Sequence, residues 1–85
     1  MNRIPVASSN LVSVGYDASR QVLAIEFKGS KKSGPKLYHF LNVPEWIYQE
    51  LIDPDSLLYN GSKGTFFSEV VKGKYKYEMV DGRKV

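Results

Sequence analysis

The residues with the clearest chemical potential are lysines that alternate with tyrosines near the C-terminus, in the stretch "KGKYKYEMV". Ammonium groups bind phosphates and tyrosine rings stack on bases, and a single-stranded nucleic acid offers both contacts. If this stretch is extended, Lys72, Lys74 and Lys76 share one face and Tyr75 and Tyr77 share the other. We therefore expect the lysine row to bind phosphates without help from these two tyrosines, or else to be the solvated side of an edge strand.

Tyr38 and Phe40 form a second candidate pair, in the stretch "LYHFLN". An aromatic-x-aromatic spacing places both rings on the same face of a strand. On a face open to solvent they form a stacking platform of the kind that single-stranded RNA binders use. Under helices the same rings belong to the core. The sequence leaves both arrangements open.

Lys63 lies in "SKGTFF", at the predicted start of a helix. The free backbone N–H groups of a helix N-terminus attract anions, so Ser62, Lys63 and Gly64 form a candidate seat for a phosphate. The competing interpretation is an ordinary capped turn with Ser62 as the N-cap.

Catalytic and metal sites are not predicted. The chain has one histidine, His39, and no cysteine. A general base needs a nucleophile or an orienting carboxylate beside it, and no such constellation accompanies His39 in the sequence. The carboxylates are dispersed and lack the spacing of zinc or calcium ligands. We expect a protein that has no enzymatic activity and needs no metal or cofactor.

Trp46 supports a different class of function. It is the only tryptophan, and it falls nearly opposite the apolar stripe of a predicted helix. An aromatic residue on a polar helix face either covers a loop or anchors a protein interface. Lys31 and Lys32, in a loop over residues 29–36, join it as candidate protein-interaction residues, together with the loop over residues 53–61.

Length and composition indicate a single globular domain. The chain has 85 residues, of which 42% are hydrophobic and 25% charged. A net charge of +3 favours polyanionic partners only mildly. Its apolar runs are far shorter than the ~20 residues that cross a bilayer or the ~7–15 that form the heart of a signal peptide. The sequence predicts a cytoplasmic domain without membrane contact.

Alternation of apolar and polar residues predicts strands at 11–17 and 21–28, which form a hairpin, and a third strand at 37–42. Between the second and third strands, residues 29–36 contain glycine, serine, proline and lysine but no large apolar residue. They predict a flexible loop.

Helical periodicity begins at Val43–Pro44. Residues 44–53 carry an apolar stripe at the spacing of a helix of about three turns. In the loop that follows, residues 57–59 ("LLY") are expected to pack back against the domain. A second helix begins after Ser62, and Gly73 is well placed to end it.

The predicted architecture is α+β. It is a small antiparallel sheet of three or four strands with two helices packed on one face, in the order β-β-β-α-α(-β). Residues 74–80 are the optional last strand, and residues 78–85 are read as a polar tail. One domain accounts for residues 1–85.

Several short patterns occur in one order along the chain: "VASSNL", "VGYD", "VLAIEF", "YHF", "NVP" and "SKGTFFSEVVKGKY". This succession resembles the KTSC domain, a family found at the C-terminus of some lysyl-tRNA synthetases and as free-standing bacterial or phage proteins. The resemblance covers about residues 6–75. It implies a compact α+β domain with a suggested RNA-binding role and no catalysis. The family's tyrosine-x-tyrosine is here Tyr38-His39-Phe40, so the second hydroxyl is missing, and the loops at 29–36 and 53–61 are longer than usual.

Taken together, the residues predict a non-catalytic binding module with RNA as the first candidate partner. The candidate nucleic-acid-binding residues are Lys63, Lys72, Lys74, Lys76, Tyr38 and Phe40. The alternative is a protein-interaction module, such as a small phage-type protein that binds and modulates a host factor. Its candidate residues are Trp46, Lys31 and Lys32.

Overall fold

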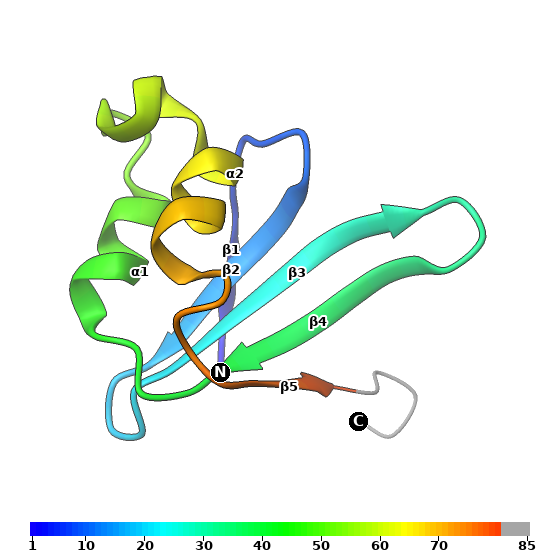
Figure 1. Ribbon diagram of the computed structural model, residues 1–85, viewed down its shortest axis with the longest axis horizontal. Helices are drawn as coiled ribbons and strands as arrows, with labels where there is room; N and C mark the ends of the chain where they lie inside the picture. Colours follow the sequence, from blue (N-terminus) through cyan, green and yellow to red (C-terminus); the bar gives the residue numbers. More distant parts are fainter. Residues whose placement is uncertain (81–85) are drawn as a thin grey trace.

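The computed structural model describes residues 1–80 as one sheet with helical segments on one side of it (Figure 1). The strands are β1 (Arg3–Pro5), β2 (Leu11–Asp17), β3 (Val22–Ser30), β4 (Gly34–Phe40) and β5 (Tyr77–Val80). Between β4 and β5 lie α1 (Glu45–Ile52), a tight turn η1 (Leu58–Gly61), α2 (Lys63–Phe66) and its continuation η2 (Phe67–Val71).

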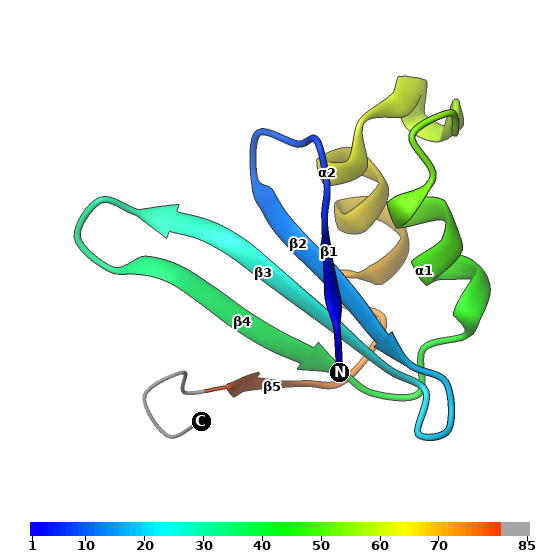
Figure 2. The ribbon, with the colours of Figure 1, turned by 180° about the vertical axis from the view of Figure 1, so that it is seen from behind.

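The predicted α+β architecture is confirmed, with five strands in place of three or four. The sheet order β1-β2-β3-β4-β5 follows the chain, and every neighbouring pair is antiparallel. Figure 2 shows from behind that α1 and α2 lie on the same side of the strands. The predicted polar tail starts too early, because residues 78–80 belong to β5. The rest of that tail, 81–85, lies outside the described residues.

Alternation along β2 places Val14 and Tyr16 toward the helices, as the period of a half-buried strand requires. A register shift between Leu11 and Ser13 adds Leu11 to the same side, where it is 1% exposed. On the opposite side the Ser13 hydroxyl donates to the Glu26 carboxylate at 2.9 Å. The bulge therefore lets one short strand supply an extra side chain to the core.

The flexible loop predicted at residues 29–36 is wrong. β3 and β4 pair out to Ser30 and Gly34, so the connection is a tight turn over residues 31–33. Gly29 makes this possible, because its φ is +69° and a Cβ there would lie 1.8 Å from the Gly34 carbonyl oxygen. The result is a long hairpin that extends past the helices on the right of Figure 1.

The first predicted helix is confirmed as α1. Ile47 and Leu51 on its apolar stripe have no exposed surface. Tyr48, on the same stripe, stacks its ring on Tyr16 of β2 with the centroids 5.5 Å apart. Glu45 lies in the first turn, where the helix dipole favours a negative charge.

The segment after α1 departs from the prediction, because Leu57 and Leu58 stay exposed and Tyr59 packs only in part, with its ring centroid 6.0 Å from that of Phe66. The side chains of Leu57, Leu58 and Tyr59 are 86%, 46% and 43% exposed. Tyr59 and Asn60 both adopt left-handed backbone conformations, with φ of 52° and 56°. These conformations reverse the chain within η1.

The second helix begins as predicted, because the Ser62 hydroxyl accepts a hydrogen bond from the Thr65 amide at 3.2 Å. Its second half is wider than an α-helix, since the Lys72 amide donates to the Phe67 carbonyl five residues back at 2.9 Å. Gly73 then adopts a φ of +79° and ends the helix, as predicted.

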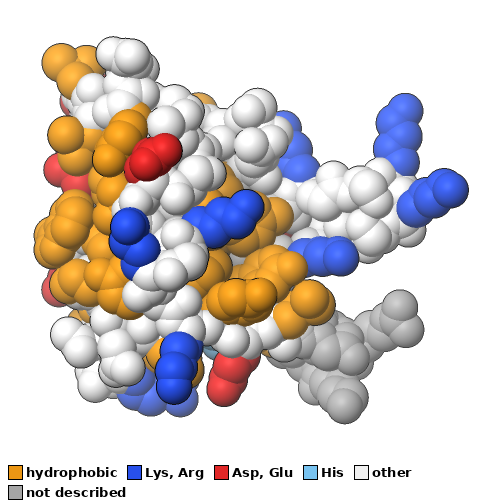
Figure 3. Space-filling model, in the orientation of Figure 1, with side chains coloured by type: hydrophobic (Ala, Val, Ile, Leu, Met, Phe, Trp, Pro, Cys, Tyr) orange, Lys and Arg blue, Asp and Glu red, His pale blue; other side chains and the backbone are white. Residues whose placement is uncertain are grey.

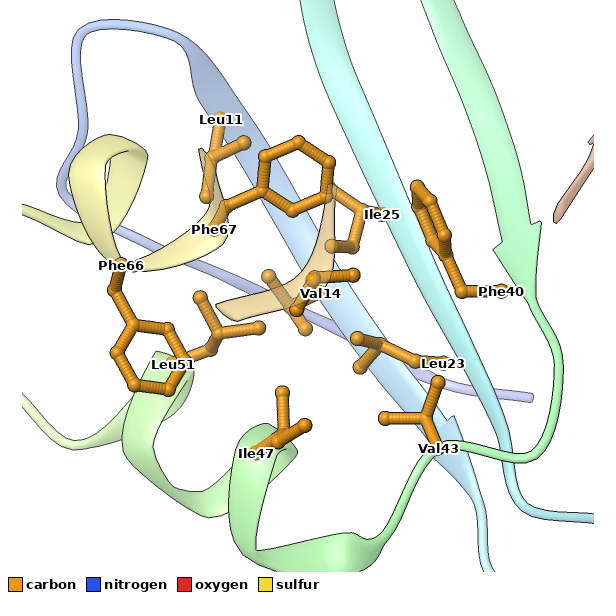
Figure 4. Close-up of a cluster of buried hydrophobic side chains, with 11 residues drawn as sticks. Leu11, Val14, Leu23, Ile25, Phe40, Val43, Ile47, Leu51, Phe66 and Phe67 are labelled. Atoms are coloured by element: carbon orange, nitrogen blue, oxygen red, sulfur yellow. The ribbon is translucent and has the colours of Figure 1, made fainter. Parts of the chain in front are cut away.

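One apolar cluster joins the sheet to the helices (Figure 4). The sheet and the segment before α1 contribute Leu11, Val14, Leu23, Ile25, Phe40 and Val43, and the helices contribute Ile47, Leu51, Phe66, Phe67 and Val71. The helices cover the part of the sheet around β2, whereas the turn of the β3–β4 hairpin extends beyond them (Figure 1).

Candidate nucleic-acid interface

The extended lysine row predicted over Lys72, Lys74 and Lys76 does not form. The chain turns at Gly73, where φ is +79°, and β5 begins only at Tyr77. The alternation of side chains that defined the row applies only to an extended backbone. The three lysines are exposed, but they do not share one strand face.

Lys63 is not positioned to hold a phosphate at the start of α2. Its ammonium group donates to the backbone carbonyls of Glu50 at 2.6 Å and Asp53 at 2.5 Å. These carbonyls belong to the last turn of α1 and its C-cap, where a positive charge is favourable. Lys63 therefore stabilises the end of α1, and the Ser62 cap corresponds to the capped-turn interpretation of this segment.

A groove opens on the helix side of the sheet, between η2 and the part of the hairpin that the helices leave uncovered. Its volume is about 570 Å³. Figure 3 shows hydrophobic side chains exposed there, with lysine or arginine side chains at their margin. Its aromatic lining residues are Phe27, Tyr38, Phe40, Phe67 and Tyr77, and its basic lining residues are Lys28, Lys36 and Lys72.

The floor of the groove is a connected set of aromatic rings. Tyr38 lies 5.5 Å from Phe27 and 5.4 Å from Tyr77 between ring centroids, both in edge-to-face geometry. Phe40 packs against Phe67 at 5.4 Å and is 4% exposed. Phe40 therefore belongs to the core, which is one of the two arrangements that the sequence left open; the other was an exposed stacking platform. Tyr38 is half-buried, and Tyr77 is 61% exposed, so these two rings offer surface to a ligand.

The charged residues of the groove are all basic. Lys36 precedes Tyr38 by two residues on β4, so it lies on the same strand face, and Lys72 approaches from the end of η2. Lys28 lines the groove from β3. No aspartate, glutamate or histidine lines it within residues 1–80. Aromatic rings and ammonium groups thus lie on one surface, which the predicted lysine row could not provide.

The three residues predicted for a protein interface do not form one surface. Trp46 lies on α1, is 54% exposed and rests against Phe66 with ring centroids 6.3 Å apart. Lys31 and Lys32 lie in the hairpin turn at the opposite end of the molecule (Figure 1). Any interface anchored by Trp46 must recruit other neighbours.

His39 points to the face of the sheet away from the groove, since it alternates with Tyr38 and Phe40. Burial lowers its pKa, and the positive charges of Arg20 and Arg3 add to the effect. Among residues 1–80, no three histidine or carboxylate side chains cluster in a way that could hold a metal ion. No helix within this part of the chain is long and apolar enough to cross a membrane.

Comparison with known proteins decides the family. The family model of the KTSC domain matches residues 7–75. The chain belongs to the KTSC domain family. It is 37% identical to an uncharacterized protein of Stutzerimonas stutzeri over 95% of this chain and all of that one. It is 32% identical to a protein of Tsukamurella paurometabola over 85% and 91% of the two chains.

The crystal structure of a KTSC domain protein from Yersinia pestis has the same fold. The two structures superpose with a TM-score of 0.72 at 35% identity, over 94% of this chain and 97% of that one. The resemblance seen in the sequence is thereby confirmed, together with its boundaries to within a residue.

The structure explains how two of the motifs that carry this KTSC resemblance cooperate. The Tyr16 hydroxyl donates to the backbone carbonyl of Val43, so the tyrosine-aspartate motif holds the valine-proline motif that starts α1. Burial raises the pKa of Tyr16, and the negative charges of Glu45 and Asp17 add to the effect. The hydroxyl that this chain lacks at Phe40 would lie in a buried aromatic cluster.

Sequence reasoning missed most of the groove. Neither Phe27 nor Lys28 is a candidate binding residue from the sequence alone. An extended backbone over residues 72–77 places Tyr77 on the face opposite the lysines, so the sequence does not predict it as a binding residue. One signal was available in the sequence. Lys36 is two residues before Tyr38, so in a strand the two side chains lie on the same face, but residues 29–36 were predicted as a loop.

Proposed function

We propose that this KTSC domain is a non-catalytic module that binds single-stranded RNA in the groove between η2 and the β3–β4 hairpin. One observation carries the proposal: half-exposed aromatic rings and lysines occupy the same surface, and no acidic residue of the described chain lines it. Single-stranded nucleic acids bind to such surfaces because bases stack on the rings while phosphates pair with the cations.

The exposure of each side chain indicates whether it would contact bases or phosphates. Tyr77 is 61% exposed and Tyr38 is half-buried beside it, so these rings are the stacking surface. Lys36 and Lys72 stand on the two sides of the groove, on β4 and after η2, and are exposed enough to reach phosphates. Phe40 and Phe67 support the rings from below.

Single strands are favoured over duplexes. A base can stack on Tyr38 or Tyr77 only if it has left its own stack, and in duplex RNA the bases remain paired and stacked. The groove lining also has no histidine, cysteine or carboxylate within the described residues, so it lacks the side chains that most often hold a metal ion or act as a general base. This composition supports the proposed binding role.

The test is a fluorescence-anisotropy titration with a mixed-sequence single-stranded RNA and with its duplex form. Loss of one stacking ring costs about 1–3 kcal/mol, so we expect Tyr77→Ala to weaken binding of the single strand by about 5- to 150-fold. Tyr59→Ala is the matched control, since this tyrosine is 43% exposed and lies outside the groove. Equal losses in both variants, or equal affinity for the duplex, would contradict the proposal.

A further inference from the structure

A second exposed surface lies on the helices, away from the groove. Its members are Trp46 of α1 and Leu57, Leu58 and Tyr59 around η1, with exposures of 54%, 86%, 46% and 43%. Trp46 and Tyr59 both contact Phe66, with ring centroids 6.3 Å and 6.0 Å away. These four exposed residues, two of which contact the buried Phe66, are called the helix-side patch. Figure 3 shows hydrophobic side chains along this left edge of the molecule, with acidic ones among them.

The patch has a defined shape. The Ser56 hydroxyl donates to the Glu50 carboxylate of α1 and accepts from the Leu58 amide at 3.3 Å. The Asn60 amide donates to the Leu57 carbonyl at 3.0 Å. These bonds tie the segment to α1 while its leucines stay in solvent. Large apolar side chains held outward in this way are typical of an interaction surface.

The charge around the patch is negative. Residues 37–62 contain no lysine or arginine, although the whole chain has twelve, and they contain Glu45, Glu50, Asp53 and Asp55. Both aspartates are exposed in the segment that leads to Leu57. The nearest lysine in sequence, Lys63, places one positive charge at the end of α1 against these four carboxylates, so the balance around the patch stays negative. The helix-side patch is thus an apolar surface with carboxylates beside it.

We propose that the helix-side patch docks a basic amphipathic helix of a partner protein. Apolar side chains along one face of that helix would cover Trp46 and Leu57, and lysines or arginines beside them would meet Asp53 and Asp55. A nucleic acid would be repelled by these carboxylates, so the patch differs in partner from the groove. The proposal does not depend on RNA binding.

The test uses the fluorescence of Trp46, the only tryptophan of the chain. The probe is a synthetic helical peptide of about 18 residues, or five helical turns, with leucine on one face and lysine on the other. Its matched control has glutamate in place of every lysine. We expect saturable binding and a blue shift of Trp46 emission with the lysine peptide and neither change with the glutamate peptide.

Two further variants locate the site. Leu57→Gln, at a side chain 86% exposed, should weaken binding of the lysine peptide about tenfold, whereas Met79→Gln, at a side chain 59% exposed on β5, should not. Asp53→Asn with Asp55→Asn should weaken binding and flatten its salt dependence. Absence of binding, equal binding of both peptides, or insensitivity to Leu57→Gln would overturn the proposal. So would self-association of the protein that Leu57→Gln abolishes, because the occupant would then be a second copy.

Discussion

Salt dependence is the sharpest test of the groove. Each phosphate contact on a single strand changes the logarithm of affinity by about −0.7 per logarithm of salt, so contacts from Lys28, Lys36 and Lys72 predict a slope of about −2.1. A fourfold rise in salt should then weaken binding by about 18-fold. In a variant with Lys36→Gln and Lys72→Gln one contact remains, and the same change in salt should weaken binding by only about 2.6-fold.

The assay is fluorescence anisotropy with a labelled single-stranded RNA at four or more salt concentrations. The matched control changes Lys74→Gln and Lys76→Gln, which removes the same charge from exposed lysines outside the groove. We expect the control to keep the slope of the native protein. If both double variants flatten the slope equally, binding follows the net charge of the protein and the groove has no special part in it.

Three further predictions concern stability. Tyr16→Phe removes the hydrogen bond to the backbone before α1 and should lower the free energy of unfolding by about 0.5–1.5 kcal/mol, measured by urea denaturation. Leu51→Ala, at a fully buried position, should cost about 2–5 kcal/mol in the same assay, and a smaller loss would mean that the core around α1 is not packed as described. Hydrogen bonds from Ser19 and Arg20 lower the pKa of Asp17 to about 2, so its contribution to stability is present above about pH 4 and is lost as the pH falls toward 2. The melting temperatures of the native protein and Asp17→Asn should therefore converge over that range; a constant difference would contradict this pKa.

The parts of the fold that the sequence predicted are those in which local preference and burial agree. Alternation over β2 and β3 and the apolar stripe of α1 follow from the periods of strand and helix. Ser62 and Gly73 marked the ends of the second helix because capping and left-handed backbone are local properties. Trp46 was predicted on the exposed side of α1, and it is 54% exposed.

The errors arose where local composition and tertiary pairing disagree. Glycine and serine at residues 29–36 suggested a loop, but glycine also permits the close approach that extends the β3–β4 hairpin. The predicted lysine row required an extended backbone over residues 72–76, but Gly73 has a left-handed backbone that interrupts any strand before Tyr77. The exposure of Leu57 had no local signal, because apolar residues in a loop ordinarily pack inward.

The groove itself could not be read from the sequence. Its walls come from Lys28 and Lys36, which the β3–β4 hairpin brings together, and from Lys72, which is far from them in the chain and reaches them only because helices are inserted between β4 and β5. The alternation of side chains along β4 places Lys36 on the same face as Tyr38, but the position of Lys72 depends on the length of η2. The position of Lys72 relative to the hairpin is therefore decided by how the helices pack, and not by the spacing of residues in the sequence.

The position of β5 has a consequence for motion. This strand of four residues lies at the edge of the sheet, pairs only with β4, and has three exposed side chains. Edge segments with few buried contacts open by local unfolding at a small fraction of the global free energy. Amide hydrogens of β5 should therefore exchange with solvent faster than those of β3, and a ligand that grips Tyr77 should slow this exchange. One wall of the groove is thus held by a short edge strand, and a ligand that fills the groove should also make β5 more ordered.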